Sequence, residues 1–251
     1  MQFKFYVRII SKRLLDLFGS SIGLILTFPL LIFAMIAVWL YDFKSPLYSA
    51  VRIGKNKVGF KMYKIRSMSV DKTKSHIVST SINDSRITPV GKYIRKFKID
   101  ELSQLLNVFI GNMSLVGPRP NVQSEVRLYT KEEEKILLVK PGITDFSSIV
   151  FSDLNELLSQ SDNPNLDYNQ LVRPWKSRLC IFYIKNQSLL IDLQLIGLTI
   201  ISIFNRKASL NLVQSILFKK DADSSLIKIS GRTSKLVPFP PPGSNDIVHQ
   251  R

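Results

Sequence analysis

An uncharged run of 25 residues, Leu17–Tyr41, dominates the hydropathy pattern of the chain. At about 1.5 Å per residue, a helix of this length can cross a hydrocarbon core of about 30 Å. Pro29 stands at its centre, and a proline removes one helical hydrogen bond and kinks the helix. No small-x-small cleavage site precedes Asp42, so the run does not resemble a secretory signal.

Basic residues flank this run on both sides: Lys4, Arg8, Lys12 and Arg13 before it, and Lys44, Arg52, Lys55 and Lys57 after it. The positive-inside rule therefore places both ends in the cytoplasm, which a straight span cannot satisfy. A re-entrant helix–break–helix with its break at Pro29 satisfies both observations. Physical reasoning alone leaves the spanning topology open. We predict that residues 1–43 form a basic N-terminus and a re-entrant membrane helix.

The pattern then changes to short alternating segments. Leu47–Val51 and Phe60–Ile65 have the composition of strands, and Gly54–Asn56 that of a turn between them. A period of two places Lys64 and Arg66 on one face of the second strand. This face is either a cationic binding surface or the solvated side of an antiparallel hairpin.

Candidate chemistry is concentrated in residues 98–120. The adjacent carboxylates Asp100 and Glu101 open a segment whose apolar residues recur with helical spacing, which predicts a buried face of Leu102, Leu105, Leu106 and Phe109. Further along, Gly117-Pro118-Arg119-Pro120 predicts a stiff loop that holds a guanidinium at low entropic cost, as phosphate binding prefers. The acid pair is either an active site for an anionic substrate or an ordinary helix cap.

Two apolar segments with interspersed polar residues, 171–184 and 188–204, predict helices, and the second is too short and too polar for a confident span. We predict that both are amphipathic helices in the membrane interface, the alternative being buried helices of the core. From Asn205 the pattern decays, and Pro238–Gly243 is rich in proline. We therefore predict a catalytic domain at 44–205 and a largely disordered C-terminal extension at 206–251.

Composition narrows the function classes. The 251 residues include 35 basic and 19 acidic ones, a formal net charge of +16 that points to nucleic acid, anionic lipid or a phosphorylated substrate. A single cysteine, Cys180, excludes an intrachain disulfide. His76 and His249 stand in polar sequence, and the stretch 69–85 around His76 predicts a loop, so a histidine metal site or a catalytic triad is poorly supported. Glycine patterns of the Rossmann and P-loop types are absent, so side chains and metal would have to hold any phosphate.

Several short motifs follow one another along the chain: Lys12-Arg13-Leu14-Leu15-Asp16, Arg52-Ile53-Gly54, Phe60–Met68, Arg86–Arg95, Asp100-Glu101-Leu102, Asn112–Pro120 and Lys140–Thr144. In this order they resemble the bacterial sugar transferases known as monotopic phosphoglycosyl transferases. The resemblance covers about Lys12 to Thr144, and more weakly continues to Ile203. Each motif alone is a weak signal, but the collinear set is a strong one.

The resemblance implies transfer of a sugar phosphate from a nucleotide-diphosphate sugar, such as a UDP-sugar, to polyprenol (undecaprenyl) phosphate. This is the first membrane step of surface polysaccharide or glycoconjugate synthesis, as for exopolysaccharide, capsule or O-antigen. Asp100 matches the family's nucleophile, which forms a phosphosugar–aspartate intermediate, and Glu101 matches the second acid. Mg²⁺ is the implied cofactor, with Asp100 as a ligand. As contacts for phosphate we add Lys64, Arg66, Arg86, Arg95 and Arg119.

The chain departs from the family pattern beside these motifs. Asp145–Ile149 replaces a commoner Gly-aromatic-Ala-Gln-Val, and Ser103 replaces a proline just after the dyad. The departures leave the dyad and the Gly-Pro-Arg-Pro loop unchanged. They put the sugar specificity in doubt, because this region helps to shape the sugar pocket.

Together these patterns predict an α+β fold in which a re-entrant anchor holds a small catalytic domain at the cytoplasmic face of the bacterial inner membrane. Two other function classes compete with this prediction. The charge suggests a membrane-tethered nucleic-acid binder, but no helix-turn-helix, zinc-finger or aromatic RNP pattern is visible, and we expect no nucleic-acid partner. A non-catalytic scaffold of a glycan pathway would not need the intact Asp100–Glu101 pair.

Overall fold

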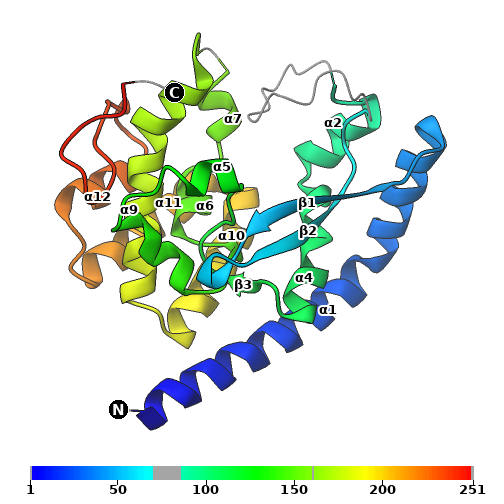
Figure 1. Cartoon of the computed structure of the whole chain (residues 1–251). Coiled ribbons are helices and arrows are strands. Elements are labelled where there is room, and N and C mark those ends of the chain that lie inside the picture. Colours follow the sequence, from blue (N-terminus) through cyan, green and yellow to red (C-terminus); the bar gives the residue numbers. More distant parts are fainter. Residues whose placement is uncertain (1, 70–85, 160, 250–251) are drawn as a thin grey trace.

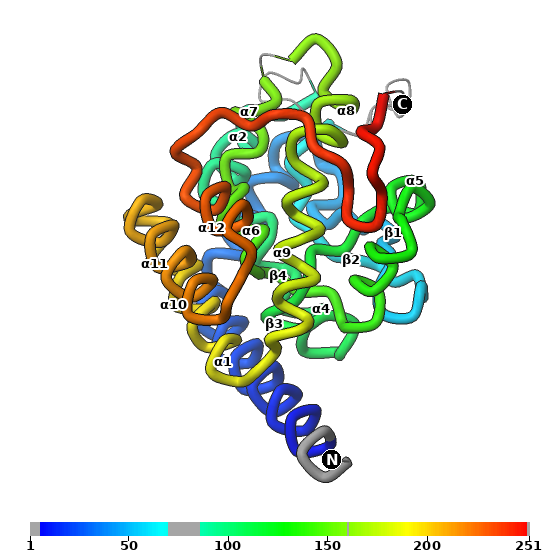
Figure 2. Tube along the Cα trace, turned by 90° about the vertical axis from the view of Figure 1, so that its left-hand side faces the viewer, coloured from blue at the N-terminus to red at the C-terminus, as the bar shows by residue number. Residues whose placement is uncertain are grey.

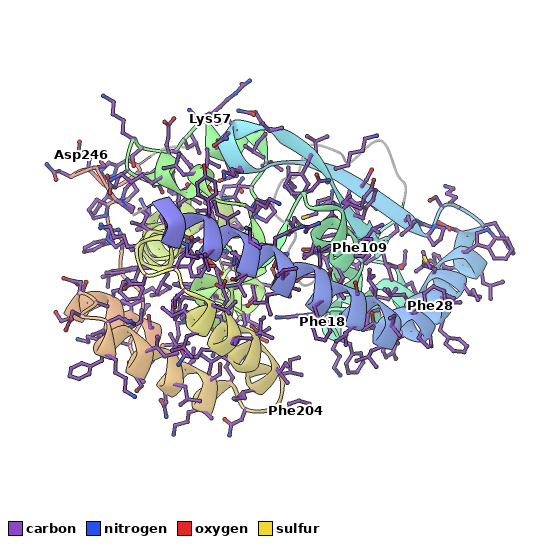
Figure 3. All side chains as sticks on the ribbon, turned by 90° about the horizontal axis from the view of Figure 1, so that it is seen from below. Phe18, Phe28, Lys57, Phe109, Phe204 and Asp246 are labelled. Carbon is purple, nitrogen blue, oxygen red and sulfur yellow. The ribbon has the colours of Figure 1, made fainter. Side chains whose placement is uncertain are left out.

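The longest element is a 41-residue helix, α1 (Gln2–Asp42), which crosses the whole molecule (Figure 1). The structure is a computed structural model that describes residues 2–69, 86–159 and 161–249. The predicted loop around His76 lies outside the described residues. Pro29 is inside α1, and the chain stays helical through it. The helix bends part-way along its length in Figure 1, and Figure 3 labels Phe28 near this bend. The predicted break is therefore a bend within one helix.

Most apolar side chains of α1 do not enter the protein core. Phe18 is 70% exposed and Phe33 is 72% exposed, in the middle of the uncharged run. Within the described residues, α1 is the one helix long and apolar enough to cross a membrane. An exposed apolar surface of this size is typical of a membrane contact. The structure thus combines a mixed helix–strand domain with a long apolar helix suited to membrane association.

Charged residues at the start of α1 fasten it to the domain. The Lys12 ammonium lies 2.7 Å from the Asp192 carboxylate and 3.1 Å from the Tyr183 hydroxyl. The Asp16 carboxylate accepts hydrogen bonds from the Ser114 hydroxyl at 2.9 Å and from the Leu115 amide at 2.8 Å. Lys12 and Arg13 belong to the basic flank of the uncharged run, and the Arg13 guanidinium caps two carbonyls at the end of α4 (Gln104–Ile110).

The predicted hairpin is present. Strands β1 (Leu47–Ile53) and β2 (Gly59–Ile65) pair in antiparallel register, with Tyr48 opposite Lys64 and Arg52 opposite Phe60. The short helix η1 (Lys55–Lys57) forms the turn. The hairpin lies on the opposite side of the molecule from α10 (Leu189–Phe204) and α11 (Arg206–Lys219) in Figure 2.

The predicted helix after the dyad forms as two pieces, α3 (Ile99–Leu102) and α4, preceded by α2 (Pro89–Lys96). The predicted buried face is only partly correct, because Leu105 is buried whereas Leu106 and Phe109 are exposed. The buried side of α4 carries Asn107 instead. Its side-chain amide donates to the Lys61 carbonyl at 2.7 Å, and its oxygen accepts from the Tyr63 amide at 2.9 Å. The Asn107 side chain therefore satisfies two backbone hydrogen-bonding groups at the edge of β2 and holds α4 against the hairpin.

The remainder of the domain is mostly helical. A short parallel pair, β3 (Ser114–Val116) and β4 (Gly142–Thr144), runs through its centre. The elements around it are α5 (Gln123–Val126), η3 (Glu133–Leu138), α6 (Phe146–Val150), α7 (Leu154–Leu157), α8 (Pro164–Asp167), η4 (Tyr168–Val172) and α9 (Arg173–Lys185). Helix α9 is a core helix, with Leu179 and Tyr183 fully buried, so the interfacial prediction for 171–184 is wrong. Helix α10 is apolar on both sides: Leu195 is buried in the core and Phe204 is exposed, so its interfacial position stays a prediction.

The prediction that 206–251 is largely disordered is wrong for the described residues. Helix α11 buries Leu210, Val213 and Leu217 in the main core, and α12 (Ser224–Ser230) follows it. Beyond α12 the chain lies across α9, as Figure 2 shows. There the ring of Phe239 stacks on Trp175 with centroids 4.5 Å apart. The apolar residues of α11 recur with helical spacing and complete the core. This burial stabilises the C-terminal segment in spite of its polar and proline-rich composition.

Candidate active site

The acid pair lies on α3, a helix of four residues. The helix begins after Lys98, whose backbone is left-handed (φ 54°) and whose side chain makes no capping hydrogen bond. Asp100 is only 8% exposed, and no hydrogen bond to its carboxylate is found in the described part of the chain. The capping interpretation of Asp100 is therefore not supported. A buried carboxylate without hydrogen bonds is costly unless a ligand uses it.

Lys64 on β2 lies against both acids. Its ammonium is 3.6 Å from Asp100 Oδ2 and 3.6 Å from Glu101 Oε1. The position of α3 over the strand is fixed in part by Ser103, whose hydroxyl lies 3.2 Å from the Tyr63 carbonyl. The hairpin thus supplies a shared cation to the pair.

Arg119 binds the outer acid. Its guanidinium contacts both carboxylate oxygens of Glu101, with Nη1 at 3.3 Å from Oε2. The loop that carries it is held from two directions. The Gly117 amide donates to the Thr144 carbonyl, and a Cβ on Gly142 would lie 2.1 Å from the Gly117 nitrogen. Only glycine at 142 permits this backbone contact, which fixes the arginine before any ligand binds.

The two acids differ in their protonation. Burial raises the pKa of Asp100, and the positive charge of Lys64 opposes this without cancelling it. Burial would also raise the pKa of Glu101, but the charges of Arg119 and Lys64 and the Arg119 hydrogen bond outweigh it and lower the pKa to about 2. Glu101 is therefore a fixed anion, whereas Asp100 is a carboxylate of higher basicity.

Arg52 is a member of the site that sequence reasoning did not select. Burial lowers the pKa of its guanidinium, and so does the nearby charge of Arg119. Its Nε is buried with no hydrogen-bond partner among the described residues. The strand register contained the signal, because Arg52 pairs with Phe60 and thus shares the face of Lys64.

The other predicted cations are placed differently. Arg95 is near enough to lower the pKa of Asp100, and its Nη1 is buried without a partner in the residues described. Arg66 follows the end of β2, and its guanidinium binds the Asp42 carboxylate and the Ser45 carbonyl, each at 2.7 Å. Arg66 is thus engaged at the junction of α1 and the hairpin. Arg86 lies at the edge of the described range, where its carbonyl accepts from the Ser69 amide. For Arg86 the phosphate contact stays a prediction.

A pocket of about 370 Å³ opens beside Glu101 and Arg119. Its polar wall includes Ser148, Asn155 and Lys176, and the Ser148 hydroxyl is buried with no partner found within the described ranges. Residues 145–149 are those that depart from the family pattern, and two of them line this pocket. The geometry thus combines a buried carboxylate, surplus cations and a cavity for a polar ligand.

In the described part of the site, the carboxylates of the acid pair are the side chains that could contribute to a metal site. No group of three or more His, Cys, Asp or Glu side chains that could hold a metal is found among the described residues. Mg²⁺ is commonly held by one or two carboxylates together with substrate phosphates. Asp100 fits this pattern, because its oxygens accept no hydrogen bond in the described part of the protein.

Comparison with known proteins decides the family. The family model described as "Bacterial sugar transferase" matches residues 7–206. The chain belongs to this bacterial sugar transferase family. The match contains α1, the hairpin, the acid pair and the pocket, whereas most of α11, all of α12 and the tail lie beyond it.

Curated relatives in the family differ in the sugar that their names give. The chain is 35% identical over 216 residues to the galactosyl transferase CpsE of Streptococcus agalactiae serotype III (strain NEM316), covering 80% of this chain and 43% of the relative. It is 32% identical over 207 residues to a UDP-glucose:undecaprenyl-phosphate glucose-1-phosphate transferase of Klebsiella pneumoniae, covering 81% and 42%. It is also 32% identical to an exopolysaccharide production protein of Rhizobium leguminosarum bv. phaseoli, covering 79% of this chain and 97% of the relative. The chain thus spans about two-fifths of the length of the first two relatives.

Proposed function

We propose that the protein transfers a sugar 1-phosphate from a UDP-sugar to a polyprenyl phosphate. The observation that carries this is the Asp100 carboxylate, buried and free of described hydrogen bonds among the cations Lys64, Arg95 and Arg119. Such a surplus of positive charge around one ionisable oxygen nucleophile suits a diphosphate. The names of relatives that act on undecaprenyl phosphate support the same substrates.

In the first step an Asp100 oxygen attacks the sugar-bearing phosphorus of the donor. The bond from that phosphorus to the bridging oxygen breaks, and nucleoside monophosphate leaves with the electron pair. In the second step a phosphate oxygen of the polyprenyl acceptor attacks the same phosphorus and releases Asp100 as a carboxylate. The raised pKa of Asp100 makes its ionised form a stronger nucleophile than an exposed aspartate.

The remaining residues have supporting roles. Glu101 stays ionised and holds Arg119 toward the phosphates of the UDP-sugar. Arg52 and Arg95 each contribute a buried guanidinium nitrogen that has no hydrogen-bond partner among the described residues. Asp100, together with donor phosphate oxygens, would hold Mg²⁺, which supplies charge neutralisation at the diphosphate. Ser148 and Asn155 face the sugar, which places the specificity in the wall formed by α6 and α7.

We further propose a re-entrant seat in the bacterial cytoplasmic membrane, with the domain facing the cytoplasm. The support is that one domain binds both ends of α1: Lys12 and Asp16 near its start, and Asp42 at its end through Arg66. Two ends that bind the same folded domain lie on the same side of the bilayer. The bend near Pro29 agrees with such a path. Cysteines introduced at Ser11 and Lys44 should be labelled from one side of sealed vesicles, and labelling from opposite sides would refute the topology.

The activity is tested with purified protein, a panel of UDP-sugars and undecaprenyl phosphate. We expect release of UMP and a lipid-linked sugar diphosphate with one or a few of the sugars. Absence of both products for every donor would favour a non-catalytic scaffold. Salt-sensitive binding of random oligonucleotides without transfer would favour a nucleic-acid binder.

A further inference from the structure

The pocket beside the acid pair has an apolar part of its lining as well as the polar wall of Ser148 and Asn155. Toward the molecular surface it is lined by Phe97, Leu102 and Leu105 from the segment α2–α4, and by Ile203 from α10. Phe97 is 64% exposed and Ile203 is 73% exposed. We call these four side chains the apolar rim. None of them carries a hydrogen-bonding group.

The polar side chains next to the rim on α10 are already satisfied. The Thr199 hydroxyl lies 2.7 Å from the Leu195 carbonyl and 2.6 Å from the Thr144 hydroxyl. The Ser202 hydroxyl donates to the Thr199 carbonyl at 2.7 Å. This wall therefore offers almost no hydrogen bonds to a ligand. A sugar or a peptide backbone would lose hydration here without replacement, whereas a hydrocarbon would not.

The apolar rim is continuous with apolar surface on both sides. Leu102 packs against the cluster of α1 and α2, and α1 approaches so closely that a Cβ on Gly23 would lie 2.9 Å from Leu105. On the other side, Phe204, which is 85% exposed, extends the apolar surface at the end of α10. In Figure 3, Phe18, Phe28 and Phe204 lie on the side of the molecule opposite Lys57 of the hairpin turn. A hydrocarbon bound at the rim would thus pass directly onto the surface suited to membrane contact.

Cations also line this pocket. Lys98, Lys176 and Arg119 line it, and the one acid among its lining residues, Glu101, is paired with Arg119. A ligand with an anionic head and a long apolar tail matches a pocket that combines these cations with the apolar rim.

We propose that the apolar rim is the channel for the acceptor's isoprenoid chain, which leaves the pocket between Phe97 and Ile203 with its phosphate toward Arg119 and Lys176. The inference rests on the proposed function and assigns the acceptor to one wall of the site. A donor sugar would use the opposite wall of Ser148 and Asn155. The two substrates of a double displacement could then bind in turn beside one carboxylate.

The first test compares Ile203→Asn with Ile200→Asn. Ile200 is 55% exposed on the same helix but does not line the pocket, so it is the matched control for loss of apolar surface. We expect Ile203→Asn to raise KM for undecaprenyl phosphate at least about tenfold, with the KM for the UDP-sugar unchanged and the control within about twofold. An acceptor with only two isoprene units should discriminate less between the variants. Equal effects of the two substitutions, or an altered KM for the donor, would overturn the assignment.

A binding measurement separates this proposal from the proposed function. Benzoylphenylalanine placed at Ile203, and in a second variant at Phe97, should crosslink radiolabelled undecaprenyl phosphate, whereas placement at Ile200 should not. Excess unlabelled undecaprenyl phosphate should compete, and undecaprenol should compete weakly. Crosslinking without transfer from any donor would refute the reaction and keep the lipid site. Transfer with no preference of the crosslink for Ile203 and Phe97 over Ile200 would refute the lipid site and keep the reaction.

Discussion

Two arginine–glutamate ion pairs in this protein have different surroundings: Arg173–Glu133 is buried, whereas Arg119–Glu101 is partly exposed. Glu133 is fully buried and binds Arg173, the Ser177 hydroxyl at 2.7 Å and the Thr130 amide at 3.0 Å. Arg173 in turn donates to the Asn169 side chain at 3.2 Å and to the Leu128 carbonyl. The pair Glu101–Arg119 has Lys64 as its neighbour, beside an acid that accepts no described hydrogen bond and an Arg52 with a buried, unpartnered Nε.

The difference separates a structural ion pair from a binding site. A complete network of hydrogen bonds repays the desolvation of buried charges and leaves nothing for a ligand. An incomplete network with surplus cations costs stability until an anion fills it. The number of unpartnered donors around an ion pair, together with its exposure, thus distinguishes the two pairs.

The largest expected effect comes from Asp100→Asn. Loss of the anionic nucleophile should reduce sugar-phosphate transfer on the order of 10³-fold or more, measured with a radiolabelled donor. Because the carboxylate accepts no described hydrogen bond, thermal unfolding should occur at the same temperature within about 2 °C. Transfer at the wild-type rate would remove Asp100 from the mechanism.

Arg173→Met should have the opposite effect to Asp100→Asn: lower stability with unchanged activity. It leaves the Glu133 carboxylate buried without its cation, which typically costs about 3–5 kcal/mol in the free energy of unfolding. Activity per folded molecule should remain at the wild-type level. Adding Glu133→Gln should restore part of the stability, measured by denaturant titration, because the uncompensated charge is then gone. A stable single variant with lost activity would mean that this second pair also serves catalysis.

Arg52→Met should weaken donor use without weakening the fold. We expect kcat/KM for the UDP-sugar to fall about 10–100-fold, because one charge-assisted contact to phosphate is lost. Arg127→Met is the control, since Arg127 is exposed and the change in net charge is the same. Similar kinetics for both variants would show that Arg52 acts only through the net positive charge of the protein and not through a direct contact with phosphate.

Lys64→Met should move the pH profile. The wild-type activity should fall at low pH with a midpoint above the ordinary aspartate value of 3.8, because burial raises the pKa of Asp100 and only its ionised form attacks. Lys64 lowers this pKa, so its removal should shift the acid limb of kcat/KM to higher pH. Lys61→Met, on the exposed side of the same strand, should leave the limb in place. A shift to lower pH would contradict the electrostatic account.

Local patterns in the sequence predicted the hairpin, the acid pair and the Arg119 loop, because each depends on neighbours within about ten residues. Arg52 was missed since its role depends on strand register, which pairs it with Phe60 and only then aligns it with Lys64. Lys12 was counted as a membrane flank, but its partner Asp192 is 180 residues away in the chain. The ordered C-terminal segment was missed because Phe239 finds Trp175 only in the folded core. Long-range pairing, which no local pattern contains, accounts for the last two, whereas the signal for Arg52 lay in the register of the hairpin itself.

In the re-entrant seat proposed above, the attachment of α1 by Lys12, Asp16 and Asp42 has a consequence for which acceptors the proposed transferase can reach. With both helix ends fastened, no linker lets the domain rise or sink, so the height of Asp100 above the hydrocarbon is set by packing alone. Such an enzyme selects its acceptor by depth. A phosphate carried at the headgroup level is within reach whatever the length of its tail, whereas the same phosphate raised on a polar spacer is not.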